Sequence, residues 1–258
     1  MSFKSDIKAG RKVTGIFLSE IAHPNLVRLT RVAGADFMVI DCEHGYFDYS
    51  QVASIVAIGT TTNFPIIVRI PEINRGCIQK YLDSGVEGIW APDVRTVEMA
   101  KALVTFSKYE PLGKRGISTM RPHSEYNPGK LTDYIRKAND TTMVFLQIES
   151  REGANNLDSM LDIAGIDGVF VGPNDMACDL GHTGNFNTPD MEECIEDVVR
   201  TCKNHSMPCG IVASNPDYLR HWAEKGMTMF SCNSEIGLLK KGIQQMLKDT
   251  NLQDRNMN

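Results

Sequence analysis

Two acids and a histidine directly follow the apolar segment 37–40 of this chain. Asp41, Glu43 and His44 stand in the stretch DCEHGYFDYS, whose polarity suits either an ordinary loop or a reactive site. A carboxylate beside an imidazole fixes the tautomer of the ring and raises its basicity. We therefore predict that Asp41 and His44 form such a pair, with His44 as a candidate general base.

Two further carboxylates follow apolar segments later in the chain. Glu149 closes the segment 142–149, and Asp175 follows the segment 167–173. If these segments are neighbouring strands, the two carboxylates converge and repel each other unless a positive charge lies between them. Mg2+ or Mn2+ is held by one or two carboxylates, with water and substrate completing its shell. The alternative is that each acid caps a helix or pairs with a surface arginine.

Polar groups beside these acids extend the candidate site. Gln147 lies on the same strand face as Glu149, two residues away, and could donate to a metal-bound water. Gly172, Asn174 and Asp175 have free backbone amides if a helix begins there, and such amides favour a carboxylate or phosphate. The alternative is that an Asn or Asp simply caps this helix.

Arg69 ends the apolar run IIVR. A guanidinium at the end of a buried strand is costly unless it is paired or faces a cleft. It could pair with Glu43 or Asp83 in a structural role. It could instead stabilise an oxyanion on a substrate.

All of these residues lie at the ends of regularly spaced apolar runs. Runs that are apolar at successive residues suit strands buried on both faces of a parallel sheet, and the stretches between them have helical spacing. Eight such strands predict a closed (β/α)8 barrel, the TIM barrel, in a single domain spanning 1–258. An open doubly wound sheet is the competitor, but FLSEIAHPN lacks its usual Gly-rich nucleotide turn. The expected strands are 13–18, 36–41, 64–70, 88–92, 142–149, 167–173, 208–213 and 227–232.

A TIM barrel would bring these polar residues together at one end of the molecule. In a TIM barrel, side chains that carry out chemistry lie at the carboxyl ends of the strands, where those described above are predicted to lie. The connection 110–141 is too long for a plain loop. We expect it to contain a helix at 130–139 and a loop lying over the barrel mouth.

Composition narrows the classes of function. The net charge of −5 argues against nucleic acid as a partner, and no apolar run approaches the length of a membrane helix. Seven scattered cysteines and a polar N-terminus without a signal segment favour a cytoplasmic protein with reduced thiols. Cys42 could be a nucleophile, but buried thiols usually serve packing.

The chain resembles the HpcH/HpaI family of class II, metal-dependent pyruvate aldolases, which includes 4-hydroxy-2-oxoheptanedioate aldolase and 2-dehydro-3-deoxyglucarate aldolase. The resemblance spans nearly the whole chain and depends on IDCEHGYFD, IIVRIPE, YLDSGVEGI, PLGKRGIS, QIES and GIDGVFVGPNDMACDLGHTGN in this order. Cys42, Ser118 and the runs GPND and MACD depart from the usual pattern, which leaves the shape of the substrate pocket open.

The resemblance implies a barrel of the phosphoenolpyruvate/pyruvate type with a defined site. Its metal ligands would be Glu149 and Asp175, and the metal would be Mg2+ or Mn2+, with Co2+ or Zn2+ as other candidates. A catalytic His44 would pair with Asp41, Arg69 would bind the pyruvate oxygen, and Asp83 would support the site. The family usually forms hexamers in which helices are exchanged between subunits, and the C-terminal helix is the candidate here. These last points follow from the resemblance alone.

The reaction that these parts suit is retro-aldol cleavage of a 4-hydroxy-2-oxo acid to pyruvate and an aldehyde. Such cleavage needs an electron sink, and the predicted strand ends carry no lysine for a Schiff base. A metal ion and Arg69 would stabilise the pyruvate enolate, while His44 would take the C4 hydroxyl proton. Gln147 and the amides from Gly172 to Asp175 would bind the substrate.

The sequence is also compatible with three other functions. The chain could be a citrate lyase β-like enzyme that cleaves an acyl-CoA, could carry out pyruvate or phosphoenolpyruvate chemistry without aldol cleavage, or could be a non-catalytic scaffold. The aldehyde is not determined by the sequence, although Arg121, His123 and Lys130 could favour an acidic one.

Overall fold

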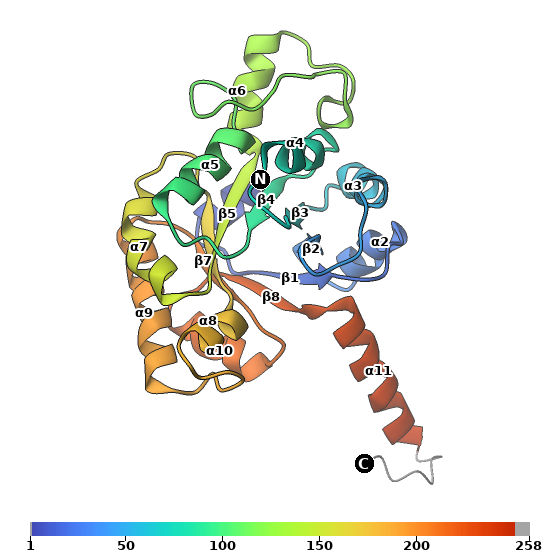
Figure 1. Cartoon of the computed structure of the whole chain (residues 1–258). Helices are drawn as coiled ribbons and strands as arrows, with labels where there is room; N and C mark the ends of the chain where they lie inside the picture. The colour runs from blue at the N-terminus through green and yellow to red at the C-terminus, as the bar shows by residue number, and fades with distance from the viewer. Residues whose placement is uncertain (1, 251–258) are drawn as a thin grey trace.

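Eight parallel strands close into a barrel in the computed structural model, which describes residues 2–250 (Figure 1). Each strand pairs with the next along the chain, and the last pairs with the first. The predicted TIM barrel is confirmed, and the open doubly wound sheet is excluded. The strands are β1 Val13–Leu18, β2 Phe37–Asp41, β3 Ile66–Arg69, β4 Gly88–Ala91, β5 Met143–Ile148, β6 Gly168–Val171, β7 Cys209–Val212 and β8 Met229–Ser234.

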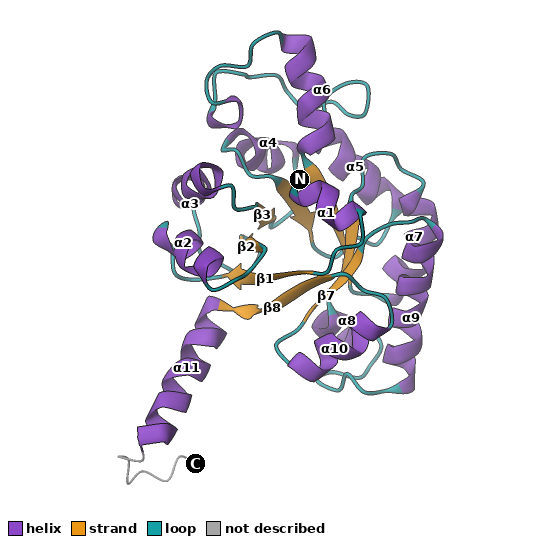
Figure 2. Cartoon of the chain, turned by 180° about the vertical axis from the view of Figure 1, so that it is seen from behind, coloured by secondary structure: helices purple, strands orange, loops and turns teal. Residues whose placement is uncertain are grey.

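Helices surround this barrel (Figures 1 and 2). Most begin at a side-chain cap, as where Asp48 and Gln51 form a capping box at the start of α3. The helices are α1 Phe3–Lys8, α2 Asn25–Val32, α3 Tyr49–Thr62, α4 Arg75–Asp83, α5 Val97–Ser107, α6 Leu131–Thr141, α7 Arg151–Leu161, α8 Pro173–Asp179, α9 Pro189–Asn204, α10 Pro216–Glu224 and α11 Glu235–Thr250, with a 3-10 turn at Pro122–Ser124.

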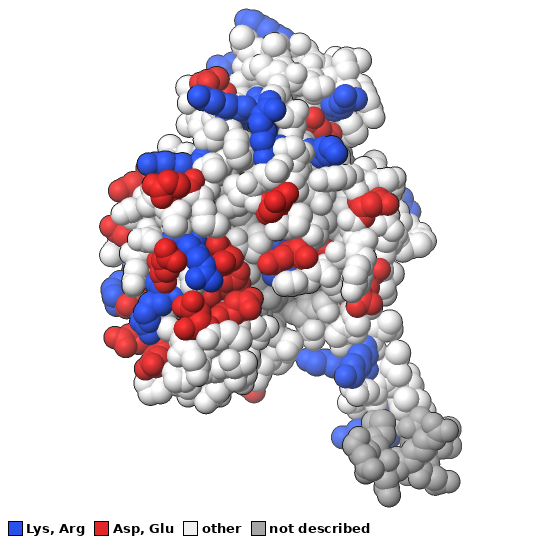
Figure 3. Space-filling model, in the orientation of Figure 1, with Lys and Arg blue, Asp and Glu red and all other residues white. Residues whose placement is uncertain are grey.

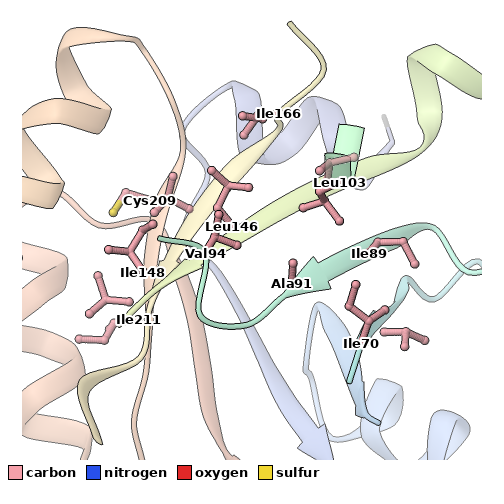
Figure 4. Packing of buried hydrophobic residues seen from close by; sticks show 14 of the residues in the cluster. Ile70, Ile89, Ala91, Val94, Leu103, Leu146, Ile148, Ile166, Cys209 and Ile211 are labelled. Atoms are coloured by element: carbon pink, nitrogen blue, oxygen red, sulfur yellow. The ribbon is translucent and has the colours of Figure 1, made fainter. Parts of the chain in front are cut away.

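The core has two parts, because each strand is buried on both faces. Aliphatic residues such as Ile89, Leu146 and Ile211 pack between the sheet and the helices (Figure 4). Aromatic residues fill the barrel interior, where Trp90 stacks on Phe170 with 3.7 Å between ring centroids. This packed interior forms the floor beneath the carboxyl ends of the strands.

Helix α1 lies against the opposite end of the barrel. Its buried Phe3 and Ile7 belong to the interior cluster, and the Phe3 ring lies 5.3 Å from that of Phe37. Lys4 binds both Thr142 and Asp167. Helix α1 therefore closes the barrel interior at this end.

The connection 110–141 contains the predicted helix, but its loop does not lie over the barrel mouth as expected. It follows helix α5, and a segment that runs from a helix to the next strand returns at the amino ends of the strands. Arg115 accordingly binds Asp83 at the end of α4, with 2.9 Å between Nη2 and Oδ1, and His123 lies 3.5 Å from the same carboxylate. The expected position over the barrel mouth is therefore wrong, because a segment that follows a helix lies at the other end of the barrel.

Helix α11 projects away from the barrel instead of joining the ring of helices (Figures 1 and 2). It exposes the apolar side chains of Leu238, Leu239, Ile243, Met246 and Leu247. Across residues 2–250, we find no helix with the length and hydropathy needed to cross a bilayer.

Candidate active site

A cavity of about 460 Å3 opens at the carboxyl ends of the strands. Acidic side chains gather beside the central hollow on this face of the molecule, among dispersed basic ones (Figure 3). The cavity brings together predicted site residues from β2, the turn after it, β3 and α8: Asp41, His44, Arg69, Asn174 and Asp175 all line it. The structure therefore brings together residues separated by more than a hundred positions.

Asp41 and Arg69 form a bidentate ion pair across neighbouring strands. They stand opposite each other in the register of β2 and β3. The Nε and Nη2 atoms of Arg69 donate to the two oxygens of Asp41 at 3.0 and 2.7 Å, and Nη1 lies 3.1 Å from Glu43 Oε2. The guanidinium carbon also lies 4.7 Å above the Phe17 ring. The predicted pairing with Glu43 is found, that with Asp83 is not, and Asp41 is an additional partner.

This network fixes Arg69 without using all of its donors. A guanidinium has five N–H groups, and the carboxylate of Asp41 accepts two of them, whereas Glu43 Oε2 forms an ion pair with Arg69 but accepts no hydrogen bond. The other N–H groups are available to an oxygen in the cavity that Arg69 lines. Structural pairing and oxyanion binding are therefore compatible. Burial raises the pKa of Glu43, an effect that the adjacent Arg69 opposes.

The predicted imidazole–carboxylate pair of His44 and Asp41 is wrong. The Asp41 carboxylate faces Arg69 and also accepts the backbone N–H groups of Glu43 and His44 at 3.1 and 3.3 Å. The His44 side chain is 70% exposed, and its Nε2 lies 3.7 Å from Glu43 Oε2. Because a tight turn follows β2, the backbone of His44, and not its ring, binds the aspartate.

Glu149 is a buried carboxylate in a fixed orientation. Trp90 donates its indole N–H to Gln147 Oε1 at 2.6 Å, so the amide nitrogen of Gln147 faces Glu149 Oε2, at 2.5 Å. The backbone N–H of Asp93 donates to Glu149 Oε1 at 2.7 Å. Burial, reinforced by the charge of Asp175, raises the pKa of Glu149 from 4.5 to about 7. Gln147 thus binds Glu149 directly, and neither residue is among those that line the cavity.

The residues around Glu149 fit a hard divalent cation. A Cβ on Gly172 would lie 2.3 Å from Glu149 Oε2, so only glycine lets the backbone approach this carboxylate. Asp175, in the first turn of α8, contributes a second charge, and no Lys or Arg in residues 2–250 pairs with Glu149. The described chain holds no cluster of three His, Cys, Asp or Glu ligands. Two carboxylates that leave positions for water and substrate suit Mg2+ or Mn2+.

Asp83 lies away from the cavity of its own chain. It is at the amino ends of the strands, bound to Arg115 as described above. His123 lines a separate cavity there together with Arg115, Gly85 and Thr142. A role for Asp83 or His123 in the cavity of the same chain is therefore not supported. The suggestion that Arg121, His123 and Lys130 favour an acidic aldehyde has no geometric basis within one chain.

Sequence reasoning assigned no role to the neutral half of the cavity. Its side chains lie at the end of β8 or in the segments that follow β1, β6 and β7. Their position near strand ends was the only signal in the sequence, because neutral side chains are common there. They are Ser19, Phe186, Asn187, Ser214, Asn215, Tyr218, Asn233 and Ser234. Cys42, in contrast, is buried, and burial raises the pKa of its thiol to about 11, which supports packing and argues against a nucleophile.

The chain is similar to known proteins over nearly its whole length. The family model described as HpcH/HpaI aldolase/citrate lyase matches residues 14–241. The 5-keto-4-deoxy-D-glucarate aldolase of Citrobacter koseri is 32% identical over 95% of this chain and 94% of its own length. The crystal structure of an HpcH/HpaI aldolase from Desulfitobacterium hafniense superposes with a TM-score of 0.92 at 28% identity, covering 100% of this chain and 99% of that one.

A more distant match shows the fold alone. The citrate lyase beta subunit of M. tuberculosis, solved with oxaloacetate and magnesium, has a TM-score of 0.56 at 13% identity, with 88% of this chain and 93% of that chain covered.

Proposed function

Because this chain belongs to the HpcH/HpaI aldolase/citrate lyase family, we propose that it is a metal-dependent aldolase that cleaves a 4-hydroxy-2-oxo acid to pyruvate and an aldehyde. One observation carries the proposal: the buried Glu149 carboxylate lies beside Asp175, without a cationic partner in residues 2–250, at the same strand ends as the fixed guanidinium of Arg69. That arrangement suits a reaction in which negative charge develops on a 2-oxo acid.

Glu149 and Asp175 would hold the divalent ion, Mg2+ or Mn2+. When bound, the ion supplies a Lewis acid for the carboxylate and keto oxygens of the substrate. The chain orients its ligands, since Trp90 fixes Gln147 and Gln147 in turn fixes Glu149. Hydrogen bonds to a ligating carboxylate of this kind sharpen its geometry and affinity.

Arg69 would direct N–H groups that are not bound to Asp41 at the oxygen that becomes negative as the C3–C4 bond breaks. Asp41 and Glu43 keep the guanidinium in place, so little reorganisation is needed during the reaction. His44, exposed at the cavity rim, would accept the proton of the C4 hydroxyl. The amides of Asn174 and Asp175 would bind the substrate carboxylate.

The neutral wall of the cavity supports a hydroxylated substrate. Ser19, Asn187, Asn215 and Asn233 offer donors and acceptors that suit hydroxyl groups. The 5-keto-4-deoxy-D-glucarate named for the relatives is a 2-oxo acid of this kind. We therefore expect tartronate semialdehyde or glycolaldehyde to be accepted in preference to succinic semialdehyde, which has no hydroxyl group.

The test is the exchange of pyruvate methyl protons with solvent deuterium, followed by NMR, together with a coupled assay of pyruvate release. Wild-type protein should show both activities with Mg2+ or Mn2+ and lose them after chelation. Glu149→Ala should lose both, along with metal binding in calorimetry. A wild type that neither exchanges pyruvate nor cleaves the aldol would refute the proposal, and cleavage of an acyl-CoA instead would favour the citrate lyase reading.

The assembly is part of the proposal. Helix α11, which follows β8, exposes an apolar face and projects away from the ring of helices that the rest of residues 2–250 form around the barrel (Figure 1). We propose that α11 packs on another copy of the chain within a homohexamer. Light scattering of the purified protein should give the hexamer mass, and Ile243→Glu should lower it.

A further inference from the structure

A buried glutamate with no part in the proposed reaction binds the loop after β1. Glu235 is the first residue of α11, and only 7% of it is exposed. Its carboxylate accepts the backbone N–H groups of Ser19 at 2.9 Å, Glu20 at 2.7 Å and Ile21 at 3.0 Å, and the Ser19 hydroxyl at 3.1 Å. Four donors from one loop therefore converge on one side chain.

This carboxylate organises the loop. No Lys, Arg or His among residues 2–250 pairs with it, so its charge is met by consecutive amides of the segment 19–21. Hydrogen bonds to an ionised acceptor are shorter and stronger than those between neutral groups. Without Glu235, the same three amides would need other partners, and the loop would lose its fixed conformation.

The loop held by Glu235 is a wall of the proposed active site. Ser19 lines the cavity together with His44. The Ser19 carbonyl approaches the turn after His44 so closely that a Cβ on Gly45 would lie 2.7 Å from that oxygen. A displacement of Ser19 is therefore transmitted to the backbone beside His44.

The same helix reaches the opposite wall. Lys241 of α11 donates from Nζ to the backbone oxygen of Ser214 at 3.1 Å, and Ser214 also lines the cavity. Because α11 extends away from the barrel (Figure 1), its direction is set by these contacts at its first turns. The root of α11, by which we mean its first two turns (residues 235–241), therefore contacts both sides of the cavity.

We propose that Glu235 is a positioning residue that locks the segment 19–21 to the root of α11, so that the orientation of this helix sets the shape of the cavity wall beside His44. The kinetic part of this inference rests on the proposed aldolase function. The structural part does not, and can be measured without any substrate.

The structural test is hydrogen–deuterium exchange of the wild type, Glu235→Ala, Glu235→Gln and the exposed control Glu224→Gln. In both Glu235 variants, peptides covering 17–24 and 42–48 should exchange about tenfold faster, because a lost hydrogen bond to a charged group is worth at least that factor. Sodium acetate should restore protection in Glu235→Ala by supplying a carboxylate to the amides, whereas sodium chloride at equal ionic strength should not. The control should match the wild type, and Glu235→Gln keeps the test valid if Glu235→Ala does not fold.

The kinetic test separates positioning from general stability. Both Glu235 variants should raise KM for cleavage about tenfold and leave deuterium exchange into pyruvate within about threefold of wild type, since Glu149, Asp175 and Arg69 lie on other elements and enolisation of pyruvate does not use His44. Unchanged exchange at 17–24 would overturn the inference. So would faster exchange confined to 17–24 with an unchanged KM, because Glu235 would then be a local anchor only. If the wild type shows no aldolase activity, the proposed function fails, and the exchange at 42–48 decides the inference alone.

Discussion

Glu149→Gln should change how the stability of the metal-free protein depends on pH. Burial raises the pKa of Glu149 from 4.5 to about 7 in the folded protein. Since the folded-state pKa lies above the unfolded one, the stability that this carboxyl contributes is fully present below pH 4.5 and is lost as the pH rises through 7. Glutamine does not titrate, so the variant should lack this loss.

The magnitude follows from the pKa change. At about 1.4 kcal/mol per pH unit, the shift corresponds to about 3 kcal/mol between pH 5 and pH 8. The glutamine should also introduce a constant cost, because its NH2 group would face that of Gln147, which Trp90 holds in place. That cost does not vary with pH, and the other titrating groups cancel in the difference between variant and wild type.

The measurement is thermal unfolding of both proteins in chelator at several pH values. From pH 5 to pH 8, the melting temperature of the variant relative to wild type should rise by about 5–10 °C, the equivalent of about 3 kcal/mol in a domain of this size. Saturating Mg2+ or Mn2+ at pH 8 should reverse the order, because only the wild type retains both carboxylates. A difference that stays constant across this pH range would refute the reasoning and show that Glu149 is not a buried, protonated acid in the metal-free state.

Three further predictions concern the reaction and its support. Arg69→Ala should lose both aldol cleavage and deuterium exchange into pyruvate, and Arg69→Lys should not restore them fully, because an ammonium cannot reproduce the bidentate bond to Asp41; normal exchange in Arg69→Ala would make Arg69 structural. His44→Ala should lose cleavage by about 10²–10⁴-fold yet retain much of the exchange, since enolisation of pyruvate involves no C4 hydroxyl; equal loss of both would place His44 in the enolisation step. Gly172→Ala should weaken metal binding by about 10–100-fold in calorimetry, because the added Cβ would displace the Glu149 carboxylate, and unchanged affinity would argue against Glu149 as a ligand.

Much of this molecule could be predicted from the sequence because its periodicity is local. Strands buried on both faces must be apolar throughout, so the runs near 37–40, 66–68 and 143–146 identify their own strands. Closure of the barrel then brings their carboxyl ends together, and with them the polar residues that follow. One cavity is therefore lined by side chains that follow or end different strands, namely Asp41, His44, Arg69 and Asp175.

The partners of these side chains were decided only by the tertiary structure. Asp41 meets Arg69 because β2 and β3 pair in that register, and the turn after β2 directs the His44 ring away from Asp41. Asp83 and the 110–141 segment lie at the other end of the barrel because a helix that leads to the next strand returns the chain to the amino ends of the strands.

The contact of Glu235, at the root of α11, with the loop after β1 shows most clearly what the sequence alone does not predict. Glu235 follows an ordinary strand, and its spacing from Ser19 in sequence predicts no contact. The two meet because β8 closes the barrel against β1, which places the ends of the first and last strands side by side. The sequence determines which segments are strands and which of their ends are polar, whereas contacts between residues far apart in the chain depend on closure of the barrel, which no local pattern encodes.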